Sequence, residues 1–185
     1  MLNIKPKILI VTEEGWAKNI QHFIANVDYG KAISSAGGLP VVAISERNID
    51  DYLELADGLL LIDGPFIHVG SYGDYYKTLN YPELHRRREI MEFALVEKML
   101  KAGKPVLGVN RGMRVINVFF GGTLCDDEKE QKIDRLGEGL TPIKFDENKQ
   151  VISFMDKTEK VIGIKCSPNC LDLSVFEKLI EEARK

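Results

Sequence analysis

Asn110 is the residue whose setting in the sequence most favours chemistry. It lies in the run 106–113 (VLGVNRGM), where an apolar, strand-like segment passes at once into a helix-like one. Gly108 and Gly112 stand two positions to either side, where small residues allow a helix and a strand to approach closely. This pattern is typical of a nucleophile elbow, a strained turn that presents one side chain at the N-terminus of a helix. The helix amide groups there would stabilise negative charge.

The side chain at this turn limits the chemistry, because a carboxamide is neither nucleophilic nor titratable near neutral pH. Among residues other than glycine, asparagine tolerates a left-handed or otherwise strained backbone best. Two interpretations of Asn110 therefore remain open. Either the side chain preserves the turn without taking part in chemistry, which we favour, or its amide hydrogen-bonds a small carboxylate or amide ligand.

The other residues with catalytic or metal-binding potential form no clear set. They are Cys125, Cys166, Cys170, His22, His68 and His85. No cysteine has an obvious base near it in the sequence, so we expect small buried hydrophobic side chains rather than a relocated nucleophile. Two thiols four residues apart and three scattered imidazoles make no metal-ligand pattern. We predict no metal ion and no cofactor.

The segment 66–85 (FIHVGSYGDYYKTLNYPELH) is dense in tyrosine. It follows a predicted strand and should overhang the site near Asn110. Aromatic rings with polar tips suit contact with a ligand or a protein, and we predict Tyr72 as a ligand-binding residue. A packed surface loop explains the composition of this segment equally well.

Alternating apolar runs and helical patterns must position these residues. Strands are predicted at 7–12, 39–44, 57–62 and 105–109, and helices at 28–36, 48–55, 87–102 and 111–120. This alternation with short turns predicts a parallel sheet covered by helices on both faces. Ligands of such sheets gather at the carboxyl ends of the strands, where Asn110 lies.

The character of the chain changes after the glycine pair at 121–122. The charged segment 126–138 (DDEKEQKIDRLGE) shows little periodicity and is predicted to be a solvated loop. Three short strands are predicted at 141–145, 150–154 and 161–165. A C-terminal helix follows, with Ser174 and Glu177 spaced as a capping box.

Composition excludes several classes of protein. The chain has 185 residues and a net charge of -3, which favours one domain spanning 1–185 and gives no basic excess for nucleic acid or anionic membranes. Three cysteines do not make a disulfide framework and fit a reducing compartment. The apolar run near the N-terminus is too short to span a membrane. We expect a soluble, cytoplasmic protein.

Several stretches resemble the class I glutamine amidotransferase-like hydrolases, closest to the branch that cleaves γ-glutamyl-γ-aminobutyrate. They are 30–42 (GKAISSAGGLPVV), 52–64 (YLELADGLLLIDG), the pair Arg88 and Glu89, and 104–127 (KPVLGVNRGMRVINVFFGGTLCDD). The resemblance runs from about 7 to 127 and resumes at 163–169. It implies a three-layer α/β, flavodoxin-like fold with a shortened C-terminal half. The Arg88–Glu89 pair is expected to be structural.

The resemblance also implies a Cys-His-Glu triad, and this chain departs from it at all three positions. Asn110 stands where the family has its nucleophilic cysteine, Ser167 where it has histidine, and Asn169 where it has the acidic partner. Thioester formation needs a thiolate and a base. Loss of a member of such a unit costs on the order of 10⁴ to 10⁶ in turnover. The implied triad is degenerate.

The turn that supplies an oxyanion-binding N–H in the family is altered as well. It reads Ile62-Asp63-Gly64-Pro65, and proline has no N–H to donate. Asp63 would place a carboxylate where an anion should be stabilised. Gly64 alone keeps the family pattern. The predicted ligand-binding residues are Asp63, Gly64, Asn110, Arg111 and Tyr72.

These observations predict a catalytically degenerate homologue. It would bind a small glutamine-like or γ-glutamyl-like ligand, or have a regulatory or partner role beside another enzyme. Since the shortened C-terminal half leaves the site less enclosed, a second copy of the chain in a homodimer is a further candidate partner. The alternative is an active γ-glutamyl or amide hydrolase with rewired catalytic residues.

Overall fold

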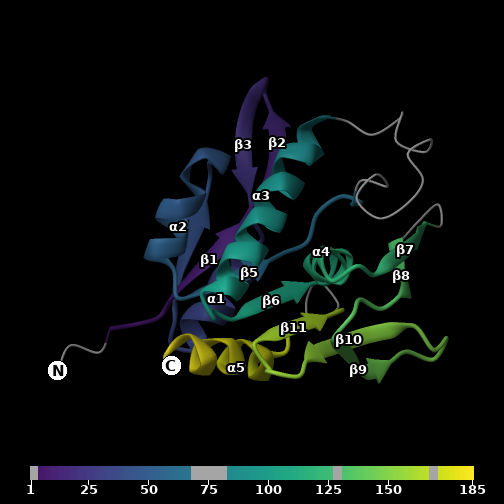
Figure 1. The fold of residues 1–185 in the computed structure, drawn as a ribbon. Coiled ribbons are helices and arrows are strands. Elements are labelled where there is room, and N and C mark those ends of the chain that lie inside the picture. Colours follow the sequence, from purple (N-terminus) through teal and green to yellow (C-terminus); the bar gives the residue numbers. More distant parts are fainter. Residues whose placement is uncertain (1–3, 68–82, 127–130, 167–170) are drawn as a thin grey trace.

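The computed structural model describes residues 4–67, 83–126, 131–166 and 171–185. Its centre is a seven-stranded sheet in the order β4-β1-β5-β6-β11-β10-β9 (Figure 1). These strands are β1 (Lys7–Val11), β4 (Leu39–Ala43), β5 (Gly58–Leu61), β6 (Val106–Val109), β9 (Leu140–Phe145), β10 (Val151–Asp156) and β11 (Val161–Ile164). The pairings from β4 to β11 are parallel, whereas β10 and β9 extend the sheet in antiparallel pairing. The predicted strands agree with these within one or two residues.

Helices cover both faces of the sheet. One face carries α1 (Val27–Ser35) and α5 (Leu173–Ala183), and the other carries α2 (Ile49–Leu55), α3 (Glu83–Lys101) and α4 (Arg111–Phe119), with a short 3-10 helix (Glu46–Asn48) before α2. Strand side chains alternate between the faces. Leu9 therefore packs in the same core as Leu95 of α3, while Ile8 and Ile10 pack with Phe176 of α5. The predicted three-layer flavodoxin-like α/β architecture is confirmed.

Two antiparallel hairpins project from this core, and neither was predicted. The first joins β2 (Glu13–Ala17) to β3 (Ile20–Ile24), and the second joins β7 (Thr123–Asp126) to β8 (Gln131–Arg135). The prediction of a solvated loop over 126–138 is wrong for residues 131–135, which form strand β8. Gln131 is 1% exposed because its carboxamide pairs with the backbone of Ile67 in both directions, at 2.7 and 2.8 Å.

Asn117 anchors the second hairpin to α4. Its side-chain amide donates to the carbonyl oxygens of Thr123 and Arg135 at 3.3 and 3.2 Å, and its oxygen accepts the N–H of Gly137 at 2.8 Å. A Cβ on Gly122 would lie 2.4 Å from this carboxamide. Asn117 is therefore fully buried with its hydrogen-bonding groups satisfied, and it links the hairpin to the helix.

The C-terminal helix begins differently from the prediction. Asp172, rather than Ser174, is the N-cap: one carboxylate oxygen accepts the backbone N–H of Ser174 at 3.1 Å and its hydroxyl at 2.6 Å. The prediction that Ser174 caps this helix is therefore wrong: the N-cap lies two residues earlier, and aspartate is among the preferred N-cap residues. In the parts of the chain that the structure describes, no helix is long and apolar enough to cross a membrane.

Candidate functional site at the β6–α4 elbow

The turn between β6 and α4 has the geometry of a nucleophile elbow. Asn110 adopts φ 50° and ψ -102°, a backbone conformation that is rare outside glycine. The flanking glycines are required by space. A Cβ on Gly108 would lie 2.5 Å from the backbone of Gly112, and a Cβ on Gly112 would lie 2.2 Å from the carbonyl oxygen of Leu61. The elbow geometry predicted from this spacing is confirmed.

The Asn110 side chain joins the elbow to the end of strand β11. Its carboxamide oxygen accepts the backbone N–H of Cys166 at 2.8 Å. It makes no capping hydrogen bond to the amides of α4. The predicted degenerate positions Ser167 and Asn169 lie outside the described residues, but the segment that leads to them starts at this hydrogen bond.

A tyrosine and a carboxylate meet at the turn that follows β5. The hydroxyl of Tyr29 donates to the carboxylate of Asp63, and Tyr29 is 2% exposed. Burial, together with the hydrogen bond to the Asp63 carboxylate, raises the pKa of the Tyr29 phenol far above its ordinary value, and the nearby Cys166 thiol adds to this shift. The turn therefore carries negative charge beside a neutral phenol, where the resemblance implies an oxyanion-binding N–H.

Behind the elbow lies a buried cluster of charged side chains from α3 and α4. One nitrogen of the Arg111 guanidinium lies 2.6 Å from each carboxylate oxygen of Glu92, and Nε of Arg88 donates to the same carboxylate at 2.8 Å. Burial alone would raise the pKa of Glu92, but the two guanidinium groups beside it lower its pKa below the ordinary value. The carboxylate is thus ionised and contacts two cations that are almost inaccessible to water. The carboxylate of Glu89, 3.7 Å from Arg111, supplies a second buried negative charge.

Arg88 also fixes the turn after β5. Its guanidinium donates to the carbonyl oxygens of Ile62 and Asp63 at 3.0 and 2.9 Å. A Cβ on Gly64 would lie 2.2 Å from this guanidinium. The structural role predicted for Arg88 is confirmed, and Gly64 is required because Arg88 fills the space beside it.

The predicted ligand-binding residues occupy different positions around the elbow. Asn110 and Asp63 approach the same residue, Cys166: Asn110 through a hydrogen bond, and Asp63 through Tyr29. The Arg111 side chain is fully buried against Glu92, so only the backbone of Arg111 is placed to meet a ligand at the turn. Tyr72 lies outside the described residues. The ligand-binding role of all these residues stays a prediction.

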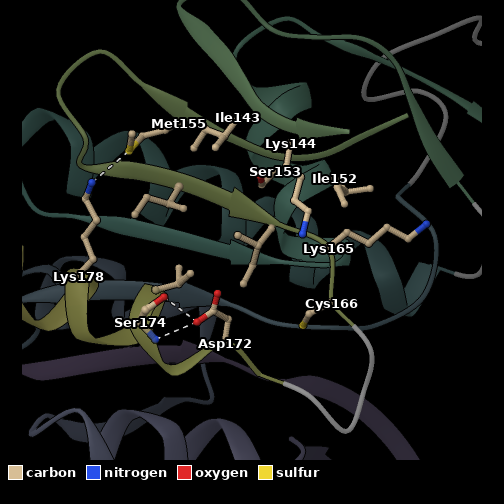
Figure 2. Close-up of a pocket in the computed structure, with 13 residues that line it drawn as sticks. Ile143, Lys144, Ile152, Ser153, Met155, Lys165, Cys166, Asp172, Ser174 and Lys178 are labelled. Carbon is tan, nitrogen blue, oxygen red and sulfur yellow. Dashed lines mark hydrogen bonds between the residues drawn. The ribbon is translucent and has the colours of Figure 1, made fainter. Parts of the chain in front are cut away.

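Two spaces adjoin this region on opposite faces of the sheet. The smaller, beside Asn110, Met113 and Gln131, measures about 20 Å³, close to the volume that one water needs. The larger measures about 340 Å³ and lies between α5 and strands β9 to β11, with Cys166 in its lining (Figure 2).

The remaining sequence candidates separate in space. Cys125 is exposed, so the expectation that it is buried is wrong: it lies on the β7–β8 hairpin, outside the core. Cys166 is half-buried, and Cys170 and His68 lie outside the described residues. Across the described ranges, no group of three or more histidine, cysteine, aspartate or glutamate side chains could hold a metal ion.

Comparison with known proteins points to one family. Residues 3–163 match the family model described as Peptidase C26. The chain is 27% identical to the "Putative glutamine amidotransferase-like protein YvdE" of Lactococcus lactis subsp. lactis, over 74% of this chain and 76% of that protein. It spans less than half the length, 44% and 43%, of two further curated relatives that it matches.

Solved structures show the same fold. A "putative GMP synthase" component from Thermoplasma acidophilum superposes with a TM-score of 0.68 at 13% identity, covering 98% of this chain and 96% of that one. A glutamine amidotransferase from Thermotoga maritima superposes with a TM-score of 0.56 at 13% identity, covering 88% and 75%. At this level of identity the likeness concerns the fold.

Proposed function

The chain belongs to the Peptidase C26 family, and from this premise we propose that it is a catalytically degenerate member that binds a glutamine-like or γ-glutamyl-like small molecule without hydrolysing it. It would act alone, as the regulatory component of a partner enzyme, or as a homodimer. The observation that carries the proposal is Asn110, a carboxamide at the tip of an intact nucleophile elbow.

The geometry of the elbow supports a protein that has lost its nucleophile but has kept the turn that would present it. Asn110 occupies the strained conformation that a nucleophile would need, yet its oxygen is engaged with the backbone of Cys166. A carboxamide has no thiol or hydroxyl to form a thioester or an ester, and its nitrogen lone pair is delocalised into the carbonyl, so it is not nucleophilic at neutral pH. The fold therefore keeps the turn while its tip is chemically inert.

The turn after β5 supports the same conclusion. The Asp63 carboxylate lies there, held by Tyr29, and Pro65 has no N–H. Oxyanion stabilisation depends on donors aimed at the place where negative charge develops. A fixed carboxylate at this turn would raise the energy of such an intermediate rather than lower it.

The same groups suit ground-state binding of a ligand. The carboxamide oxygen of Asn110 already accepts a hydrogen bond from Cys166, while its NH2 group offers two donors to a ligand. The N-terminal amides of α4 begin at the next residue and favour an anion. A carboxylate or the amide carbonyl of a γ-glutamyl compound presents acceptors of this kind, which is why we propose the γ-glutamyl branch.

Two measurements on the purified chain test this proposal. Isothermal titration with glutamine and with γ-glutamyl-γ-aminobutyrate should show saturable binding, and incubation with the same compounds should release no ammonia or amine above a blank. Turnover that iodoacetamide abolishes would instead favour an active hydrolase with rewired residues, the alternative function. Absence of both binding and turnover would leave neither account standing.

A further inference from the structure

The larger of the two spaces is an apolar cavity on the face of the sheet that α5 covers. It measures about 340 Å³ and opens between the first half of α5 and strands β9, β10 and β11 (Figure 2). Its apolar lining comes from Ile143, Ile152, Met155, Ile162, Ile164 and Val175. Ile162 and Ile164 continue the core beneath α5, whereas Ile143 is 56% exposed. This volume falls within the range of about 300–1,000 Å³ that is typical of small-molecule sites.

Irregular pairing of β9 with β10 shapes this cavity. The register shifts twice within residues 151–154. A regular strand would send neighbouring side chains to opposite faces, but here Ile143 and Lys144 both line the cavity, and so do Ile152 and Ser153. β-Bulges re-aim side chains and are over-represented beside functional sites. The bulges therefore bring one apolar and one polar side chain of each strand into the lining of the same cavity.

One cation of the lining is unengaged. Lys144 extends from β9 toward the part of the cavity where Lys165 and Cys166 lie (Figure 2). Within the residues that the structure describes, its ammonium group has no hydrogen bond or ion pair. Lys165 and Lys178 add positive charge to the same lining.

The negative groups nearby are already engaged. The ammonium of Lys178 lies 2.6 Å from the carboxylate of Glu159. Asp172 is the one acidic residue of the described lining, and its carboxylate accepts two hydrogen bonds from Ser174 at the start of α5. Lys165 also has an interaction partner, so the positive charge that remains for a ligand is that of Lys144.

From these observations we infer that the cavity binds a small amphipathic carboxylate, an apolar chain or ring that bears one negative group. The apolar body fills the space beneath α5 and burying it supplies most of the affinity. The carboxylate lies beside Lys144. The site is distinct from the proposed elbow site, although the two share Cys166, whose side chain lines the cavity while its N–H is held by Asn110.

Isothermal titration of the full chain with octanoate tests this inference, with octanol and octyltrimethylammonium as probes of the same chain length. Octanoate should bind saturably with a stoichiometry of one. Octanol should bind about threefold to fivefold more weakly because it lacks the charge, and the cationic probe more weakly still. Equal affinity for all three probes, or no saturable heat with octanoate, would overturn the proposal.

Variants locate the octanoate site. Lys144→Glu should weaken octanoate binding by about tenfold or more, and Ser153→Trp should block it by filling the cavity. Lys157→Glu makes the same charge change on an exposed residue outside the lining and should bind octanoate as the wild type does. Circular dichroism confirms that each variant is folded. Equal weakening by Lys144→Glu and Lys157→Glu would contradict a local contact.

Two further measurements distinguish the octanoate site from the elbow site and from an interface with a second copy of the chain. Excess γ-glutamyl-γ-aminobutyrate should leave the octanoate stoichiometry unchanged, so that failure at the elbow does not imply failure here. Sedimentation analysis gives the oligomeric state. A dimer that Ile143→Glu dissociates, together with absence of octanoate binding, would assign this face to a second copy of the chain and overturn the proposal.

Discussion

Asn110 and Cys166 are joined by a 2.8 Å hydrogen bond from the Cys166 backbone to the Asn110 carboxamide. The backbone N–H of Asn110 also donates to the carbonyl oxygen of Ile164 at 2.8 Å. One residue therefore ties the end of β6 at two points to the end of its parallel neighbour β11. The residue at the tip of the elbow is a structural link between strands.

The first prediction concerns the stability that this link provides. Asn110→Ala should lower the free energy of unfolding by about 2 kcal/mol, since it loses a hydrogen bond and places a Cβ-bearing residue without a compensating side chain at positive φ. Asn110→Gly relieves the backbone strain and should lose only about 1 kcal/mol. Urea denaturation measures both values. Equal losses would show that the backbone conformation is not strained.

The second prediction concerns catalysis. Asn110→Cys restores a thiol at the elbow but should release no amine from γ-glutamyl amides above background, because the neighbouring turn carries Asp63 and Pro65 and no triad base has been restored. Mass spectrometry after incubation with substrate checks for a trapped acyl-enzyme. Substantial turnover by this variant would reveal a base supplied by another residue.

The sequence determined the sheet and the elbow because both depend on local patterns. Apolar runs such as those of β1 and β5 have only one environment that suits them, the middle of a covered sheet. The glycines at 108 and 112 indicate that a strand and a helix approach each other closely, whatever the rest of the fold is. These features follow from neighbours along the chain, so composition and spacing predict them.

The burial of Gln131 and the charged cluster were missed because they depend on distant partners. Gln131 is buried by its hydrogen bonds to Ile67, 64 residues away, and a polar residue in a charged segment gives no sign of this. Arg88 and Glu92 show helical spacing, but only Arg111 from another helix explains why the pair is buried. The start of α5 was misplaced for a local reason, because both Asp172 and Ser174 are residue types that cap helices and only the structure shows which one does.

The third prediction tests the close approach at the elbow. Gly112→Ala places a Cβ 2.2 Å from the carbonyl oxygen of Leu61, and both are backbone-fixed, so α4 must move away from the sheet. We expect a loss of about 2–3 kcal/mol in the free energy of unfolding. Gly30→Ala is the control: it lies in α1 with its nearest neighbour, a Pro40 side-chain atom, at 4.0 Å, and should gain about 0.5–1 kcal/mol. Similar behaviour of the two variants would argue against the tight packing.

The fourth prediction concerns the buried carboxylate of Glu92. Glu92→Gln leaves Arg88 and Arg111 without their shared counter-ion, and the free energy of unfolding at pH 7 should fall by about 3–5 kcal/mol. Glu97→Gln is the matched control, because Glu97 lies on the same helix in an exposed pair with Lys101, and it should remain close to wild type.

The pH dependence of the same variant gives an independent check. The folded pKa of Glu92 is below its ordinary value of 4.5, so ionisation stabilises the fold above that value, and the contribution is lost as the pH falls from 4.5 toward the folded pKa. The stability of the wild type should therefore fall more steeply than that of Glu92→Gln in this acid range. Urea denaturation at pH 7, 5, 4 and 3.5 measures the difference. Parallel curves for the two proteins would mean that the pKa of Glu92 is the same in the folded and unfolded states, which contradicts the prediction. A shallower fall for the wild type would mean that the folded pKa of Glu92 is raised instead.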